Sequence, residues 1–238
     1  CRVILSLQAM TTQSIPFNLH SDPVLALTEL CDLHPQGIVF TTSLGLEDQI
    51  LTDIICRNNL PVRIVTLDTG RLFPETYALI DKTRDRYNVK IEHFFPNTLS
   101  LEELVNEQGM NAIFKSVESR KKCCGVRKVQ PLLRSLKGAK VWVTGLRAEQ
   151  SENRNNLPRI ELDSLSGLLK FNPLLTWSDS DLENYIEENN VPINTLHKKG
   201  FPSIGCEPCT RAVKDGEHPR SGRWWWEKSS QECGLHKG

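Results

Sequence analysis

The chain lacks features that would assign it to several large classes of proteins. Its 238 residues contain no apolar run near the ~18 residues that a membrane-spanning helix needs. There is no charge excess, because 29 basic residues offset 29 acidic ones, whereas a general nucleic-acid-binding protein normally carries a basic surplus. Residues 1–9 hold too short an apolar stretch for a signal peptide, and Met10 is a candidate start. We therefore expect a cytoplasmic protein that binds neither membranes nor nucleic acid.

Cysteine, by contrast, is plentiful and clustered. Structural disulfides are rare in the cytosol, so clustered cysteines there more often indicate metal or redox chemistry. Cys123 and Cys124 are adjacent, Cys206 and Cys209 form a C-x-x-C pair, and Cys233 stands alone near the C-terminus in the segment QECGLH. The first four thus predict a metal centre, and the fifth predicts a nucleophile.

The spacing of the four clustered cysteines favours iron–sulfur over zinc. Zinc sites favour two C-x-x-C pairs, because that spacing wraps around a single tetrahedral ion. Adjacent cysteines suit a larger cubane better, since each of its separated iron atoms takes one thiolate. We therefore expect a [4Fe–4S] cluster, with zinc and unrelated buried cysteines as the alternatives. Such a cluster with its four thiolates carries net negative charge, which the basic residues around the first cysteine pair would offset. The alternative is that these residues only form the surface of an ordinary amphipathic helix. They are Lys121, Lys122, Arg127 and Lys128.

Strand and helix patterns alternate along the first half of the chain. This order predicts right-handed crossovers and a mostly parallel sheet with helices on both faces. The expected strands are 38–42, 62–67, 89–95, 140–144 and 167–171, and the clearest helices begin at Pro23, span Pro74–Tyr87 and span 179–190 after Ser178. We expect a poorly ordered N-terminal extension over 1–20, one α/β domain over 21–215 and a mobile C-terminal arm over 216–238.

Polar turns follow three of these strands, with the sequences SLGLED (43–48), LDTG (67–70) and GLRAEQSENR (145–154). Ligands of such sheets bind at the carboxyl ends of the strands. Ser43 and Gly45 precede a helix whose N-terminal N–H groups suit a phosphate or sulfate, and no Walker A lysine follows. Arg147 and Arg154 could bind an oxyanion, because a planar guanidinium group can donate two parallel hydrogen bonds to it. The alternatives are ordinary turns and a salt-bridge network with neighbouring glutamates.

Cys233 needs a cationic environment to act as a thiolate at neutral pH. His236 is close in sequence, and Arg220 and Arg223 are further sources of positive charge. A passive thiol on the C-terminal tail is the alternative.

Taken together, these motifs resemble the assimilatory adenylylsulfate (adenosine 5′-phosphosulfate, APS) reductases of the wider phosphoadenylylsulfate reductase family. The resemblance runs from about residue 22 onward and rests on the three turns, the CC…CxxC set and the terminal ECGLH. It implies a Rossmann-like fold of the adenine-nucleotide α-hydrolase type, with a mostly parallel twisted sheet. It implies that Cys233 attacks the sulfate sulfur of APS, releases AMP and becomes S-sulfocysteine. Thioredoxin, as a transient partner, would then release sulfite for cysteine biosynthesis.

The resemblance also implies roles for particular residues. The metal ligands are Cys123, Cys124, Cys206 and Cys209, the catalytic residues are Cys233, Lys128 and His236, and the substrate-binding residues are Ser43, Gly45, Glu47, Asp48, Leu67, Asp68, Thr69, Gly70, Arg147, Arg154, Arg220 and Arg223. One departure is Ser230, where the family usually has Lys; Lys228 is nearby. The sequence leaves open a 3′-phosphorylated substrate (PAPS), an iron–sulfur thiolation enzyme of the same fold, a zinc-binding module, and homo-oligomer formation.

Overall fold

The computed structural model describes residues 19–150, 154 and 156–227. The expected extension over 1–20 lies almost entirely outside this range, and so do Cys233 and His236. Residues 216–227 of the expected C-terminal arm are described. Within this stretch Arg223 and Trp224 are buried, so this part of it packs against the domain.

A six-stranded sheet forms the centre of the molecule, with strand order β3-β2-β1-β4-β6-β5. All neighbouring strands are parallel except β5 and β6. The strands are β1 (Ile38–Thr42), β2 (Arg63–Leu67), β3 (Ile91–Phe94), β4 (Val141–Val143), β5 (Ile160–Leu162) and β6 (Leu169–Phe171). Short apolar and β-branched runs give these strands, as the sequence predicts for all but β5, which lies at the edge of the sheet and has no buried residue.

Helices connect the parallel strands and begin at recognisable caps. The Asp22 side chain accepts hydrogen bonds from the first turn of α1, and Ser178 and Asp181 form a reciprocal capping box at α7. The helices are α1 (Pro23–Leu33), α2 (Leu46–Arg57), α3 (Pro74–Tyr87), α4 (Thr98–Gln108), α5 (Val117–Cys124), α6 (Gln130–Ser135) and α7 (Asp179–Asn189). No helix of the described residues is long and apolar enough to cross a membrane.

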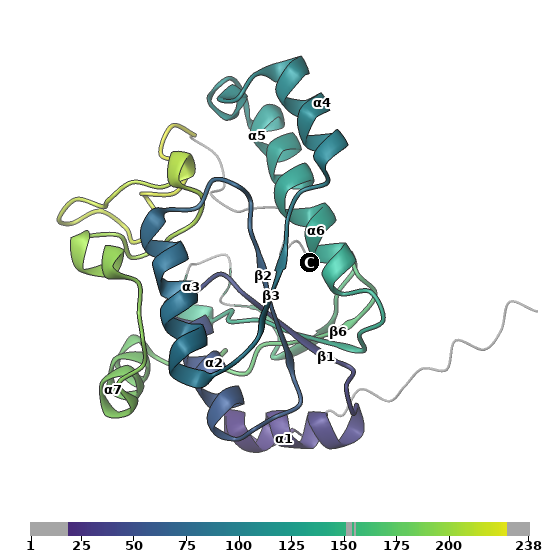
Figure 1. Cartoon of the computed structure of the whole chain (residues 1–238). Helices are drawn as coiled ribbons and strands as arrows, with labels where there is room; N and C mark the ends of the chain where they lie inside the picture. The colour runs from purple at the N-terminus through teal and green to yellow at the C-terminus, as the bar shows by residue number, and fades with distance from the viewer. Residues whose placement is uncertain (1–18, 151–153, 155, 228–238) are drawn as a thin grey trace, which may run out of the picture.

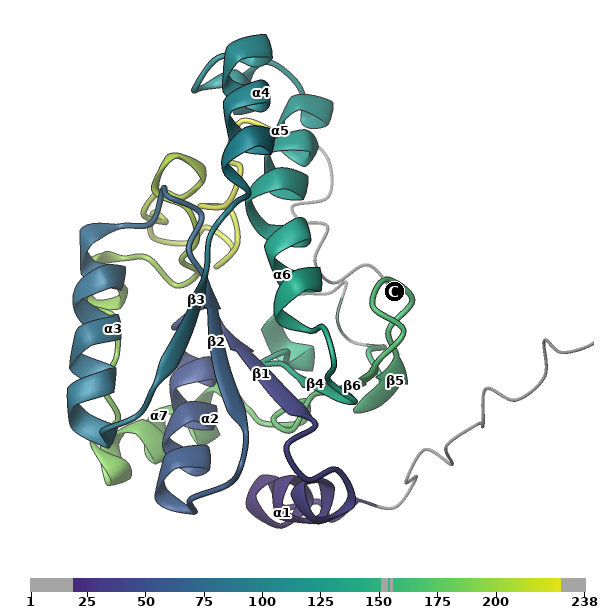
Figure 2. The same cartoon turned by 45° about the vertical axis from the view of Figure 1, so that its right-hand side comes forward.

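Apolar side chains cover both faces of the sheet. Ile38, Phe40 and Ile64 pack on one face with residues of α1, α2 and α7. Val39 and Trp142 pack on the other face with residues of α6. Figures 1 and 2 show these helices on opposite sides of the strands. The expected α/β fold with helices on both faces is therefore confirmed.

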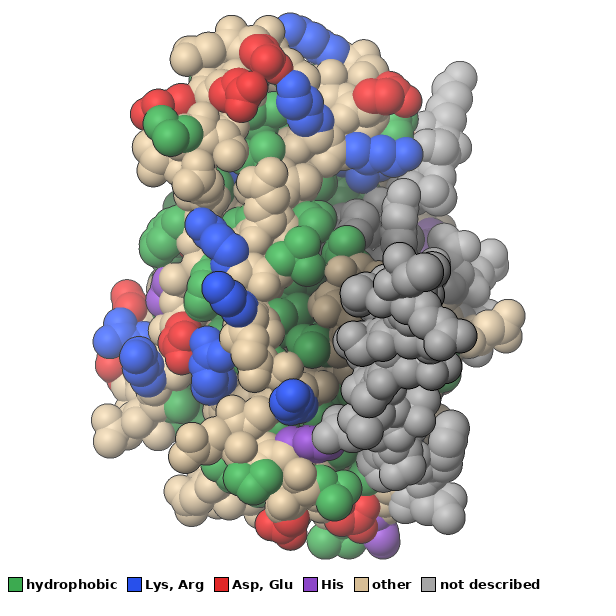
Figure 3. Space-filling view, turned by 90° about the vertical axis from the view of Figure 1, so that its right-hand side faces the viewer, with side chains coloured by type: hydrophobic (Ala, Val, Ile, Leu, Met, Phe, Trp, Pro, Cys, Tyr) green, Lys and Arg blue, Asp and Glu red, His purple; other side chains and the backbone are tan. Residues whose placement is uncertain are grey.

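The carboxyl ends of the strands form the functional edge of the sheet. Because β1 lies between β2 and β4, the three polar turns that follow these strands come together there. α4 and α5 project beyond this edge, and the chain before Glu227 returns to it (Figure 2). Acidic and basic side chains lie close to one another on α4 and α5 (Figure 3), including the Lys122–Glu107 ion pair.

Candidate active site

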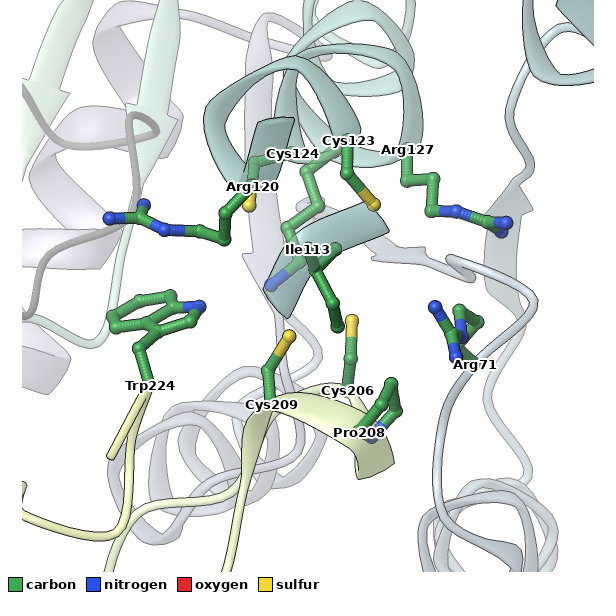
Figure 4. Close-up of a pocket in the computed structure, with 11 residues that line it drawn as sticks. Arg71, Ile113, Arg120, Cys123, Cys124, Arg127, Cys206, Pro208, Cys209 and Trp224 are labelled. Carbon is green, nitrogen blue, oxygen red and sulfur yellow. The ribbon is translucent and has the colours of Figure 1, made fainter. Parts of the chain in front are cut away.

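Four cysteine thiols line one pocket at the functional edge. Cys123 and Cys124 are the last two residues of α5. Cys209 is the last residue of the 3₁₀ turn η6 (Glu207–Cys209), and Cys206 directly precedes that turn. In Figure 4 the sulfur atoms of the two pairs point toward one another across the pocket. The structure thus brings together the two cysteine pairs that lie far apart in the sequence.

A π-helix follows the adjacent cysteines directly. This segment, η2 (Gly125–Val129), continues α5 with a wider turn before α6. π-Helical turns are rare and are frequent at functional sites. Arg127 and Lys128 belong to this turn, and both line the thiol pocket. The sequence indicated that these basic residues lie near the cysteines but gave no sign of the wider turn.

Positive charge surrounds the thiols. Arg71, Arg120, Arg127 and Lys128 all line the pocket. Burial alone would raise the pKa of the Cys206 thiol, but Lys128, a hydrogen bond from Thr69, and Arg223 and Arg127 outweigh it and leave that pKa below its usual value. Burial and the neighbouring Cys206 instead raise the pKa of Cys209 to about 12. These pKa shifts are those of the free thiols, with no metal bound.

The pocket also contains a buried donor that has no acceptor. The Trp224 indole is 1% exposed and lines the pocket, yet its Nε1 has no hydrogen-bond partner. Such orphaned donors are rare in protein interiors and call for an explanation. An anionic cluster with sulfur acceptors, four thiolate ligands and surrounding cations would provide one. The residues of the pocket therefore fit a four-thiolate iron–sulfur cluster, although no group of three or more His, Cys, Asp or Glu in the described chain is arranged to hold a metal ion.

The LDTG turn after β2 touches this pocket. Thr69 Oγ1 lies 3.3 Å from Cys206 Sγ, and the Thr69 carbonyl accepts a 2.5 Å hydrogen bond from Arg127. Asp68 Oδ1 accepts hydrogen bonds from the Gly70 N–H and the Tyr77 hydroxyl, so this carboxylate shapes the turn. The turn that we expect to contact the substrate is thereby fixed against the cysteine site.

Arg71 ties the same turn to both cysteine-bearing segments. Its guanidinium donates to the Met110 carbonyl at 2.8 Å and to Asn111 Oδ1 at 2.7 Å, next to the helical turn that precedes α5. Its own carbonyl accepts a 2.9 Å bond from the Glu207 N–H in η6. Arg71 directly follows the LDTG motif, but its sequence position alone did not indicate these contacts.

The SLGLED turn after β1 is closed by its own carboxylate. The Ser43 N–H and hydroxyl donate to Asp48 Oδ2 at 2.6 and 2.7 Å. Gly145 of the third turn lies so close that a Cβ there would overlap Asp48 Oδ1. Both hydrogen-bond donors of Ser43 are thus bonded to Asp48 in this structure. The roles of Ser43, Gly45 and Asp48 in substrate binding stay predictions.

Burial of Asp48 predicts a pH dependence of stability. Burial raises the pKa of this carboxyl to about 6, despite the hydrogen bonds from Ser43. The folded protein therefore retains a proton that the unfolded chain releases, and stability falls as the pH rises from about 4 to 6, by on the order of 3 kcal/mol. We expect Asp48→Asn to remove this fall. Urea unfolding at several pH values would measure it, with Asp81→Asn, at an exposed carboxylate, as the control; an unchanged slope in Asp48→Asn would contradict the assignment.

Arg147 joins the first and third turns through a carboxylate network. Its buried guanidinium donates to Glu47 Oε1 at 3.1 Å, to Glu149 Oε2 at 3.2 Å and to Asp179 Oδ1 at 2.5 Å. Arg154 donates to Gln150 within the same turn. In this structure Arg147 forms a salt-bridge network, which is the alternative that the sequence left open. Binding of the substrate by Arg147 or Arg154 stays a prediction.

Arg223 lies at the cysteine site, and Arg220 in the loop before it. The Arg223 guanidinium stacks over the Trp224 ring at 4.8 Å, hydrogen-bonds Ser203 at 3.3 Å, and packs so closely on Gly205 that no Cβ would fit there. The Arg220 N–H donates to His218 Nδ1 at 3.1 Å. Their closure over a substrate stays a prediction.

Comparisons with known proteins decide the family. Residues 37–212 match the phosphoadenosine phosphosulfate reductase domain. The chain belongs to this family. It is 51% identical over 199 residues to the adenosine 5′-phosphosulfate reductase of Rhizobium meliloti, covering 83% of this chain and 75% of that one. It is 46% identical over 230 residues to the reductase of the same name from Allochromatium vinosum, covering 96% and 89%. The predicted resemblance to APS reductases, and with it the enzyme class, is confirmed.

Solved structures agree with the family assignment. The phosphoadenylyl-sulfate reductase of Candida auris, in a phosphate complex, has a TM-score of 0.66 and 30% identity, covering 78% of this chain and 88% of that one. The FMN adenylyltransferase of Candida glabrata has a TM-score of 0.53 at 18% identity, covering 91% and 72%, and shows the fold alone. The expected Rossmann-like fold is confirmed.

Proposed function

We propose that this member of the family reduces APS to sulfite and AMP. The observation that carries the proposal is the convergence, at one edge of the sheet, of four thiols, the LDTG turn and a set of buried cations. Support for APS rather than PAPS comes from the relatives named APS reductases, which are 46–51% identical to this chain. The PAPS reductase of Candida auris is 30% identical.

The LDTG turn and the cations near the thiols have distinct parts in binding. The LDTG turn, with Leu67 at the end of β2, offers backbone edges to the adenosine portion of APS. Arg71, Arg127 and Lys128, which line the thiol pocket, and Arg223, whose charge acts on Cys206, face the sulfate end, where negative charge must be held. This division would leave the sulfate sulfur accessible to a thiolate arriving from outside the pocket.

The proposed reaction needs three successive thiol attacks and no added metal hydroxide. The Cys233 thiolate attacks the sulfate sulfur of APS, an S–S bond forms, and the bond from sulfur to the bridging oxygen breaks, so AMP leaves with the electron pair. A thiol of reduced thioredoxin then attacks Cys233 Sγ and expels sulfite with the electrons of the S–S bond. The second thioredoxin thiol resolves the mixed disulfide and returns Cys233. In total, one dithiol becomes a disulfide and two protons are released.

Preorganised positive charge would lower the barrier of the first step. A thiolate and a sulfate are both anionic, so their approach is opposed in the absence of counter-charges. Fixed cations aimed at developing charge are a large source of rate enhancement, because they need no reorganisation during the reaction. We assign this role to Lys128, in the π-helix, and to Arg223, next to Trp224. His236, which we expect to assist Cys233, lies outside the described residues.

We also propose that Cys123, Cys124, Cys206 and Cys209 hold a [4Fe–4S] cluster. When bound, it supplies a fixed negative charge and a structural link between the two cysteine segments; both electrons come from thiols. A cubane spreads its four thiolates more widely than one ion does, and therefore needs no group that closes around a single metal ion. Iron and acid-labile sulfide in the brown anaerobic protein would support this proposal, and stoichiometric zinc would contradict it.

The proposed setting is cytoplasmic sulfate assimilation that feeds cysteine synthesis. The experiment that tests the function is sulfite release by anaerobically purified protein, with APS or PAPS and with or without reduced thioredoxin. We expect thioredoxin-dependent sulfite from APS and at least tenfold less from PAPS. Equal turnover would indicate a dual enzyme, and turnover of PAPS alone would contradict the proposal.

A further inference from the structure

Several contacts with the cysteine-bearing segments fix the chain segment that leads into the C-terminal tail. We call Trp224–Glu227 the arm root, because Cys233 follows it by six residues (227 to 233). Trp224 has a φ of 45°, in the left-handed region that a bulky side chain rarely adopts. Such a conformation persists only where the surroundings enforce it.

Three contacts enforce this conformation, and each comes from a segment that carries or borders the cysteine pairs. The Trp224 N–H donates to the Cys209 carbonyl at 3.2 Å. The Trp226 ring packs edge-on against Phe114, just before α5, with centroids 4.5 Å apart. Glu227 pairs with Arg120 of α5.

The Arg120–Glu227 pair is the strongest of the three. Arg120 Nε and Nη2 donate to the two Glu227 oxygens at 2.9 and 2.7 Å, and the side chains are only 2% and 3% exposed. Two parallel charge-assisted bonds fix direction as well as distance. The Arg120 guanidinium also stacks over the Trp224 ring at 4.7 Å. Arg120 lies four residues before Cys124, on the same face of α5.

We propose that Arg120 and Glu227 form a latch that positions the arm root, and thereby Cys233, relative to the thiol pocket. The inference rests on the proposed function, because it assigns the latch to the step in which Cys233 meets the sulfate. The six residues from Glu227 to Cys233 span at most about 20 Å when fully extended. The position of the arm root therefore limits the volume that the Cys233 thiol can reach. A released arm root would let Cys233 sample a larger volume and meet the sulfate less often.

The latch is a positioning device, so its test separates positioning from structure. The test variant is Arg120→Gln/Glu227→Gln, which removes both charges and leaves no unpaired buried ion. The matched control is Arg63→Gln/Glu92→Gln, because that pair also forms two parallel bonds, at 3.2 and 2.9 Å, between β2 and β3. In single turnovers with saturating APS and no reductant, we expect AMP release to slow at least tenfold in the test variant and less than twofold in the control. Iron content and AMP affinity should match the wild type.

Hydrogen exchange gives a readout that does not depend on the reaction. The Trp224 and Glu227 amides donate to the Cys209 and Trp224 carbonyls, so both should exchange at least tenfold faster once the latch is lost. If the double variant does not fold, Arg120→Lys takes its place. This variant keeps the positive charge but cannot donate the two parallel hydrogen bonds to Glu227, so AMP release and amide exchange can be compared in the same way.

The outcomes separate the latch from the function. Slower AMP release with faster exchange and full iron supports the proposal. Unchanged AMP release, unchanged exchange, or a loss of iron that accounts for the slower rate would overturn it. If wild-type protein releases no AMP from APS, the proposed function fails and the positioning role fails with it, while the exchange data still show whether the pair holds the arm root.

Discussion

Replacing Cys233 with Ser should abolish sulfite formation from APS. A hydroxyl at this position is not ionised at neutral pH and is a far poorer nucleophile toward sulfur, so we expect turnover to fall by at least about 10³-fold. Because Cys233 is not one of the four proposed cluster ligands, iron content and AMP binding should stay within about twofold of the wild type. Anaerobic sulfite assays, iron analysis and AMP titration measure all three.

The control for this variant is Cys56→Ser. Cys56 is a half-buried thiol on α2, and burial raises its pKa to about 11, so it is protonated at neutral pH. We expect this variant to retain turnover. Substantial sulfite formation by Cys233→Ser, or an equal loss in both variants, would remove Cys233 from its assigned role.

Replacing Cys206 with Ser should remove the cluster and destabilise the fold. Cys206 packs in the core at the pocket with Cys209, Ile113 and Trp224. Metal binding is coupled to folding, so the loss of one ligand removes stability that the cluster otherwise contributes. We expect loss of nearly all iron and sulfide and a fall in Tm of at least about 10 °C. Metal analysis, visible absorption and thermal unfolding measure these effects.

Cys31→Ala separates loss of the cluster from loss of a buried thiol. Cys31 lies on α1, is buried in the main core and does not line the pocket. Its removal should cost about 1 kcal/mol and leave the iron intact. Full iron content in Cys206→Ser would mean that the ligand set is wrong.

The sheet could be predicted because its strands are short, apolar and separated by clear turns. The expected runs at 38–42 and 62–67 correspond to β1 and β2 within one residue, and the helix expected at Pro74–Tyr87 has the bounds of α3. β5 was missed, because its three residues, Ile-Glu-Leu at the edge of the sheet, carry only a weak strand pattern. α4 was missed as well, since it buries only Leu104 and has no continuous apolar stripe.

The candidate site was predictable in its residues but not in its arrangement. Cysteine spacing predicted that two distant pairs would converge, and both pairs line one pocket. The π-helix after Cys124 could not be foreseen, because its residues have no distinctive pattern. The Arg120–Glu227 pair was equally hidden, since its partners are 107 residues apart. Motifs reveal which chemistry is present, whereas tertiary packing decides which charge meets which partner.

The most direct test of the account is the mass of the protein after reaction with stoichiometric APS in the absence of reductant. We expect each active chain to gain one SO₃ group, to carry it on Cys233 in peptide maps, and to lose it as sulfite when reduced thioredoxin is added. AMP release from an unmodified protein, or an SO₃ group on another residue, would contradict the central claim that Cys233 takes the sulfur from APS.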